Sequence, residues 1–240
     1  MFSQFRQHTL PTWPFFHLLR QAQLADFPDI LFSEIRFSLA DFDPSLFAAC
    51  GIPPPAHLSK AVKKRQAEYL ASRYLAQQVM SHYGIGHFLL QNSRDRAPIW
   101  PLGIAASLSH THHCAVLLST DTDQLVGVDI EQLIAAEVAA GLQETLLVAA
   151  ESQRLARSGL SFTQAITVAF SLKESLYKAL YPHSQQFIGF HDAMVIEVDA
   201  VNGTACLQLT KNIGAAFPAG RQFNGYFQLR REEVITLVID

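Results

Sequence analysis

Two short segments carry acidic and basic side chains whose types and spacing could do chemistry. The first, Gly127-Val128-Asp129-Ile130-Glu131, alternates as a strand does, so Asp129 and Glu131 point to one face and the apolar residues to the other. Their Cα atoms lie roughly 6.6 Å apart, two strand rises. Carboxylates at that separation can converge on one hard cation, and oxygen ligands suit Mg²⁺ better than zinc. The alternative is an edge strand with two solvated acids.

The second segment, FSLKESLYKAL at residues 170–180, lies in an otherwise apolar stretch. On a helix, Glu174 and Lys178 share one stripe, while Lys173 begins the adjacent stripe. An ordinary amphipathic helix with an i,i+4 ion pair is one explanation. Beside the acidic strand, however, Glu174 can supply a third oxygen ligand. A cation flanked by lysines is what a polyphosphate site needs, because both neutralise phosphate oxygens.

Two further groups could contact phosphate. Ser109 and His110 end the segment Ser107-Leu108-Ser109-His110 and can donate hydrogen bonds to phosphate oxygens. His112 and His113 follow, so a transition-metal site is an alternative for the HTHH run. Arg65 and Arg73 are eight residues apart and fall near one helix face. A solvated basic face is the alternative there, although arginine is the better bidentate phosphate ligand.

The elements that must position these residues follow from hydrophobic periodicity. Helices are expected at residues 59–82, 134–157 and 161–181, the last starting at a Ser-Phe-Thr-Gln capping box and ending before Pro182. Strands are expected at 30–41, 87–92, 105–120 and 125–133, followed by an antiparallel meander over 190–240. The first thirty residues are expected to be poor in strands. This order suggests two similar halves joined near residue 120.

Composition excludes several classes of protein. The chain has 240 residues, 49% of them hydrophobic, which indicates a compact globular fold. A formal net charge of −3 argues against a nucleic-acid binder. We expect no signal peptide and no transmembrane segment, since neither pattern occurs. The scattered Cys50, Cys114 and Cys206 favour a reducing, cytoplasmic location.

Four segments together resemble the monomeric 4′-phosphopantetheinyl transferases of the surfactin and enterobactin synthetase type. They are KKRQAEYLASR, RAPIWPLGIAASLSH, GVDIE and FSLKESLYKA, and they occur in the family's order between about residues 63 and 180. GVDIE or KES alone would be a weak signal, whereas all four in order form a specific signature. The first two favour the enterobactin-type branch.

The resemblance implies a fold and a division of the chain. The fold would be α+β, with two similar α+β halves related by a pseudo-twofold axis. Residues 1–119 would hold the helix that binds coenzyme A phosphates and the SLSH strand. Residues 120–240 would hold the magnesium site and the FSLKESLYKA helix. Coenzyme A and the active site would lie in the cleft between the halves, and the protein would be a monomer.

The resemblance also implies a reaction and its metal site. The phosphopantetheine arm of coenzyme A would move to a serine hydroxyl of an apo acyl or peptidyl carrier protein, releasing 3′,5′-ADP. Asp129, Glu131 and Glu174 match the family's Mg²⁺ ligands, and Glu174 would also act as a general base. Lys178 would assist catalysis. The residues matching or expected to make coenzyme A phosphate contacts are Arg65, Arg73, Arg96, Ser109, His110, Lys173 and Lys178.

Two other classes of protein could have the same acidic residues and lysines. A Mg²⁺-dependent phosphohydrolase would employ the three acids with water as the nucleophile, and it would form product without any carrier protein. A non-catalytic homologue would bind carrier proteins only. The presence of Asp129, Glu131 and Glu174 together with the lysines disfavours this second alternative.

Overall fold

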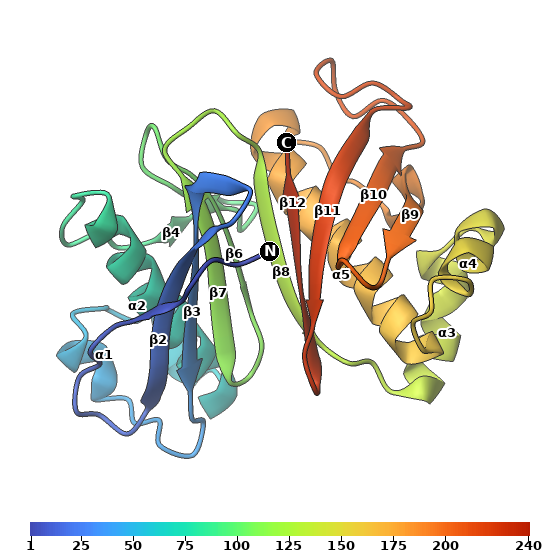
Figure 1. The fold of residues 1–240 in the computed structure, drawn as a ribbon. Coiled ribbons are helices and arrows are strands. Elements are labelled where there is room, and N and C mark those ends of the chain that lie inside the picture. Colours follow the sequence, from blue (N-terminus) through green and yellow to red (C-terminus); the bar gives the residue numbers. More distant parts are fainter. The chain divides into compact units, whose positions relative to one another are not determined.

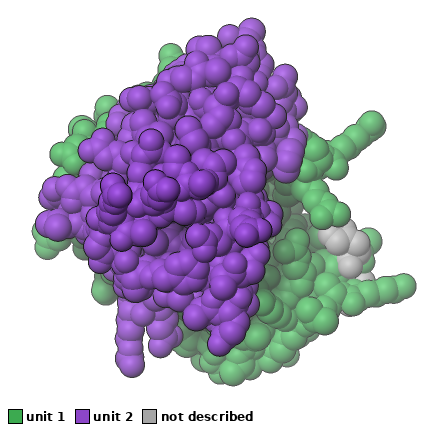
Figure 2. Space-filling view, turned by 90° about the vertical axis from the view of Figure 1, so that its right-hand side faces the viewer, with its two compact units in different colours: residues 1–123 green, residues 124–240 purple. Residues whose placement is uncertain are grey.

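The computed structural model describes residues 1–240, apart from the side chains of His57 and Ser59. The chain divides into two compact units, Met1–Asp123 and Gln124–Asp240, coloured green and purple in Figure 2. The sequence predicted a boundary between residues 119 and 120, which lies a few residues earlier, within the last strand of the first unit. Among the described residues, no helix combines the length and apolarity needed to cross a membrane.

The first unit is an antiparallel sheet with one long helix on it (Figure 1). Its strands order as β1-β2-β3-β7-β6, and the helix α2 contacts β3, β6 and β7. Side chains such as Ile35, Leu75 and Leu117 fill the space between sheet and helix. The elements are β1 (Arg6–Gln7), β2 (Phe16–Leu24), β3 (Phe27–Phe37), α1 (Leu46–Ala49), the 3₁₀ helix η1 (Ala56–Lys60), α2 (Lys63–His82), β4 (Gln91–Asn92), β5 (Pro98–Ile99), β6 (Ala105–His110) and β7 (Cys114–Thr120).

Two predictions for this unit were wrong. The first thirty residues contain the nine-residue strand β2. Its pairing with β3 shifts register near both of its ends, and these irregularities break the period-two pattern that would have revealed it. Within the strand predicted at 87–92, only β4 forms a ladder, and the apolar Leu90 packs into the core from the loop before it.

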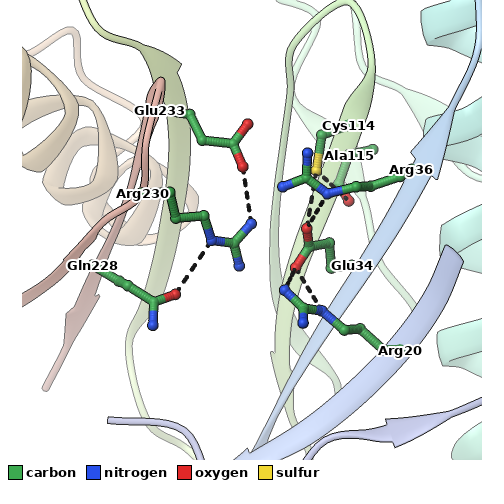
Figure 3. A network of polar contacts seen from close by, with 8 residues as sticks. All are labelled: Arg20, Glu34, Arg36, Cys114, Ala115, Gln228, Arg230 and Glu233. Carbon is green, nitrogen blue, oxygen red and sulfur yellow. Dashed lines mark hydrogen bonds and ion pairs between the residues drawn. The ribbon is translucent and has the colours of Figure 1, made fainter.

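A buried ion network holds one face of the first sheet (Figure 3). Glu34 of β3 is fully buried, and its Oε2 accepts hydrogen bonds from Arg20 Nε at 3.0 Å and Nη2 at 2.7 Å. Its Oε1 accepts one from Arg36 Nε at 2.9 Å, with Cys114 Sγ at 3.6 Å. Two guanidinium groups thus compensate a carboxylate that would otherwise be costly to bury.

The second unit has the same kind of construction. Its sheet orders as β8-β12-β11-β10-β9, all neighbours antiparallel, and α5 lies across β8, β12 and β11 (Figure 1). The elements are β8 (Val126–Gln132), α3 (Ala136–Leu146), α4 (Ala149–Leu155), α5 (Phe162–Ser184), the 3₁₀ helix η2 (Phe190–Asp192), β9 (Ala193–Asp199), β10 (Thr204–Leu209), β11 (Gln222–Leu229) and β12 (Glu233–Ile239). The predicted meander is confirmed. At the turn between β11 and β12, Arg230 bonds Gln228 and Glu233 (Figure 3).

The ends of the helices differ partly from the prediction. The capping box is confirmed, since Ser161 Oγ accepts from Gln164 N and Gln164 Oε1 accepts from Ser161 N. The helix continues past Pro182 to Ser184, so the proline does not end it, and Gln185 N still bonds to the carbonyl of Tyr181 beyond it. The single helix expected at 134–157 is two, α3 and α4, separated by extended backbone at Leu147 and Val148.

The two units share a connectivity that explains their similar order of elements. In each, the strand that precedes the long helix pairs with the last strand of the unit: β3 with β7, and β8 with β12. Both units are therefore α+β, as the sequence predicted. Each long helix packs on its own sheet and buries its own core.

Candidate active site

The strand β8 presents Asp129 toward α5. The Oδ2 atom of Asp129 accepts a hydrogen bond from Ser171 Oγ at 2.7 Å, and its Oδ1 accepts one from Lys178 Nζ at 2.7 Å. Only 2% of Asp129 is exposed, whereas Glu131, two residues further along, is half-buried. The alternative of two solvated acids on an edge strand is thus wrong for Asp129, which is an internal group of this unit.

The close approach of α5 to β8 depends on Gly127. A Cβ atom at this position would collide with the backbone carbonyl of Ser175 on α5. Because glycine leaves that space open, the helix lies directly on the strand. The same contact brings Ser171 and Lys178, one turn to either side of Ser175, onto the carboxylate of Asp129.

The three predicted metal ligands influence one another electrostatically. The pKa of Glu131 is raised to about 7, first by burial and then by the charges of Asp129 and Glu174, with Lys178 opposing the rise. Burial also raises the pKa of Glu174, with Lys178 lowering it and Asp129 raising it. Three carboxyl groups therefore share one partly buried region with one ammonium, and a further cation would relieve their repulsion.

The carboxylate oxygens of Asp129, Glu131 and Glu174 do not surround a common point at which a cation could bind. Within the described part of the chain, no group of three or more His, Cys, Asp and Glu side chains is placed to hold a metal ion. One reason is that Lys178 Nζ lies where a cation would bind: it donates a hydrogen bond to Oδ1 of Asp129 and contacts the carbonyl of Val128 at 3.3 Å. The chemistry of the donor set nevertheless fits Mg²⁺, because all three side chains offer hard carboxylate oxygens.

The structure does not place Lys173 as expected. Its Nζ donates to the carbonyls of Leu146 at 2.8 Å and Phe190 at 2.7 Å, and it pairs with Glu151 at 2.9 Å. The side chain is 3% exposed. Lys173 and Lys178 are five residues apart, so they leave the helix about 140° apart and cannot face the same group. In this arrangement all three donors of Lys173 Nζ are used inside the unit, which argues against the predicted phosphate contact.

In the first unit, α2 and the β4–β5 hairpin bring together the three predicted arginines. Arg73 stacks on Tyr69, with its guanidinium carbon 4.2 Å from the ring centre. Asn92 links Arg73 to the hairpin, because its Oδ1 accepts from Arg73 Nη2 and its Nδ2 donates to the carbonyl of Arg96. Burial lowers the pKa of Arg73, and nearby Arg65 lowers it further. An anion would relieve this concentration of positive charge.

Ser109 and His110 lie at the end of β6, next to β7. Successive strand residues point to opposite faces, and Ala106 and Leu108 face the core under α2. His110 therefore shares the face of α2, whereas Ser109 is buried on the opposite face. The structure thus does not bring these two side chains onto one group.

Several residues of the site were missed from the sequence. Ser171, Thr236 and Glu151 contact Asp129, Ser171 and Lys173, respectively. For Ser171 a signal was present, because it lies three residues before Glu174 and one turn before the close contact at Ser175. Thr236 and Glu151 come from other elements, and nothing in their local sequence marks them.

Comparison with known proteins identifies the class of protein. Residues 54–119 match the model of the 4′-phosphopantetheinyl transferase N-terminal domain, and residues 125–227 match that of the 4′-phosphopantetheinyl transferase superfamily. The second match includes the acidic strand β8 and all of α5. The chain belongs to this superfamily.

Individual relatives agree with the family models. Enterobactin synthase component D of Escherichia coli O157:H7 is 36% identical over 165 residues, covering 65% of this chain and 75% of that protein. The protein of the same name from Salmonella typhi is 33% identical over 210 residues, covering 86% and 87%. The 4′-phosphopantetheinyl transferase PptT of Mycobacterium tuberculosis is 25% identical over 181 residues, covering 74% and 78%.

The chain is therefore a 4′-phosphopantetheinyl transferase. It transfers the phosphopantetheine arm of coenzyme A to a carrier protein, so coenzyme A and the carrier protein are its partners. Nothing in the comparisons supports the phosphohydrolase considered from the sequence.

Proposed function

We propose that Asp129, Glu131 and Glu174 hold the Mg²⁺ ion of the transfer reaction. The observation that carries this proposal is that three carboxyl groups share one partly buried region beside Lys178, where burial first, and then the charges of Asp129 and Glu174, raise the pKa of Glu131 to about 7. When bound, the ion supplies positive charge to the pyrophosphate of coenzyme A as charge develops there. The ligand chemistry of the three side chains fits that ion.

The protein's own residues then act on the proton and the phosphate oxygens. Glu174 takes the proton of the carrier serine, directly or through water, as the serine oxygen bonds to the phosphorus that bears the pantetheine arm. The bond from this phosphorus to the departing 3′,5′-ADP breaks in the same displacement. Burial raises the pKa of Glu174 toward neutral pH, which suits a general base. Lys178 Nζ donates to phosphate oxygens once it leaves Asp129.

The arginine cluster of the first unit is our candidate for coenzyme A phosphates. Arg73 Nε is buried and has no hydrogen-bond partner among the described residues, so an anion that reached it would satisfy an otherwise unpaired donor. Arg65 and Arg96 supply two exposed guanidinium groups, the second fixed through its backbone by Asn92. Ser109 and His110 stay predicted phosphate contacts. We leave Lys173 out of the proposed phosphate contacts, because its Nζ bonds inside the second unit.

The relatives named enterobactin synthase component D suggest the pathway. We propose that the carrier proteins served belong to nonribosomal peptide assembly of a siderophore. We also propose that the protein is a monomer. We further propose a cytoplasmic location, which the free thiols of Cys50, Cys114 and Cys206 support. Mass spectrometry of several apo carrier proteins, incubated with the protein, coenzyme A and Mg²⁺, tests the pathway, and light scattering tests the oligomeric state.

The metal site is tested by Asp129→Asn and Glu174→Gln. Both substitutions keep side-chain volume and remove a negative charge, so we expect folded proteins whose transfer activity falls at least about a hundredfold. The readout is the phosphopantetheine mass gain on an apo carrier protein at saturating coenzyme A. Glu144→Gln, at an exposed position on α3, is the matched control and should retain activity. Full activity of either site variant would refute the proposed ligands.

A further inference from the structure

A chain of three buried hydroxyl groups ends on Asp129. Ser171 and Ser175 of α5 and Thr236 of β12 are all fully buried. Ser171 Oγ contacts Thr236 Oγ1 at 2.9 Å, and Thr236 Oγ1 contacts Ser175 Oγ at 2.7 Å. Thr236 lies directly across the ladder from Asp129, which explains how β12 reaches this place.

Proton counting fixes the direction of this chain. A hydroxyl has one proton to donate, and an ionised carboxylate can only accept. Ser171 donates to Asp129, so its contact with Thr236 has to be one in which Thr236 donates. Thr236 then has no proton left for Ser175, and Ser175 donates to Thr236, at its Oγ1 or its backbone carbonyl 3.0 Å away. The protons of Ser171 and Thr236 therefore point toward Asp129.

Such a chain holds and polarises one oxygen of the carboxylate. Each donated hydrogen bond strengthens the next in a buried environment. The bond from Ser171 keeps Oδ2 of Asp129 in place, so that Oδ1, now paired with Lys178, is the oxygen that can turn to a cation. Partners that orient a ligand in this way are a regular part of metal sites.

We propose that Ser171 is a positioning residue for Asp129 and that Thr236 and Ser175 support it from behind. The inference rests on the proposed metal site, which makes Asp129 a ligand. Ser171 acts through Asp129 and does not touch the reacting atoms. Its loss should therefore weaken the affinity for the divalent ion and leave the chemistry at saturating ion concentration nearly unchanged.

The chain offers a closely matched pair of variants. Ser171→Ala and Ser175→Ala remove the same group, one helical turn apart, from equally buried positions that both contact Thr236. Only Ser171 contacts the carboxylate. We measure Mn²⁺ binding to the full chain by the loss of the free-ion electron paramagnetic resonance signal, with thermal melting as a check on folding. Ser171→Cys replaces Ser171→Ala should the alanine variant not fold, because a thiol is a much weaker donor of similar size.

The expected result separates the two serines. Ser171→Ala should weaken Mn²⁺ binding by about tenfold or more, and Ser175→Ala by less than about twofold. In the transfer assay, Ser171→Ala should need about tenfold more Mg²⁺ for half-saturation and then reach a kcat near that of the wild type.

Two outcomes overturn the inference, and they are distinct. Wild-type Mn²⁺ affinity in Ser171→Ala, with Asp129→Asn binding poorly, would show that the hydroxyl serves packing alone, and an equal loss in both serine variants would refute a positioning role specific to Ser171. Equally weak Mn²⁺ binding by the wild type and Asp129→Asn would overturn the metal site itself and this inference with it.

Discussion

Replacement of Lys173 by methionine distinguishes a structural ammonium from a phosphate ligand. Methionine keeps the length and apolar stem of the side chain and removes only the charge and the donors. The lost contacts are those to Leu146, Phe190 and Glu151, at 2.7 to 3.0 Å. Burial lowers the pKa of Lys173, and Glu151 offsets part of this effect, so each charge depends on the other for its place in the interior.

The magnitude follows from the charge left behind. In the variant, Glu151 keeps the backbone N–H groups of Val195 at 2.8 Å and Val148 at 3.3 Å but loses its counter-ion, while its side chain stays 0% exposed. Leaving one member of a buried ion pair uncompensated costs about 3–5 kcal/mol. At about 2–4 °C per kcal/mol for a chain of this size, the melting temperature should fall by roughly 6–20 °C.

Thermal and urea unfolding measure this loss, and two further variants locate it. Adding Glu151→Gln to Lys173→Met removes the stranded charge and should recover at least about 1 kcal/mol. Lys211→Met, which breaks a pair with Asp192 at a lysine whose side chain is 55% exposed, should change stability by less than about 1 kcal/mol.

The same variant reports on ligand binding. Below its melting temperature, Lys173→Met should bind coenzyme A within about twofold of the wild type by calorimetry, because Nζ bonds to Leu146, Phe190 and Glu151 and these are not among the proposed metal or phosphate ligands. A variant that melts like the wild type but binds coenzyme A at least about tenfold more weakly would refute this reasoning, and it would return Lys173 to the phosphate ligands.

Two further predictions concern packing and pH. Gly127→Ala should destabilise the second unit by about 1–3 kcal/mol, because the new methyl group meets the carbonyl of Ser175, whereas Gly141→Ala, with open space around it on α3, should stabilise by up to about 1 kcal/mol. Urea unfolding measures both, and equal effects would contradict the argument. Burial raises the pKa of Glu68 above its ordinary value of 4.5, so the folded state binds the proton more tightly, and this contribution to stability is present at low pH and declines as pH rises above about 4.5. Glu68→Gln should reduce that decline between pH 4.5 and 7.5, with Glu144→Gln as control, and an unchanged slope would argue against it.

The sequence alone determined the class of protein and much of its framework. Strand alternation in residues 127–131 places Asp129 and Glu131 on one face, and the helical period of residues 170–180 places Glu174 and Lys178 on one stripe. These are local relations, which neighbouring residues settle by themselves. The start of α5 at Ser161 and the C-terminal meander followed from the same kind of pattern, whereas the α+β class was implied by the resemblance to a family. The order of four segments was enough to indicate the family.

Only the tertiary structure decided what each helix face meets. A helical period shows that Lys173 and Lys178 diverge, but it does not say which of them faces β8. Packing of α3, α4 and η2 against α5 settles this, because their carbonyls and Glu151 enclose Lys173. Thr236 is close to Asp129 only because the last strand pairs beside β8, and contacts between residues so distant in sequence leave no local pattern.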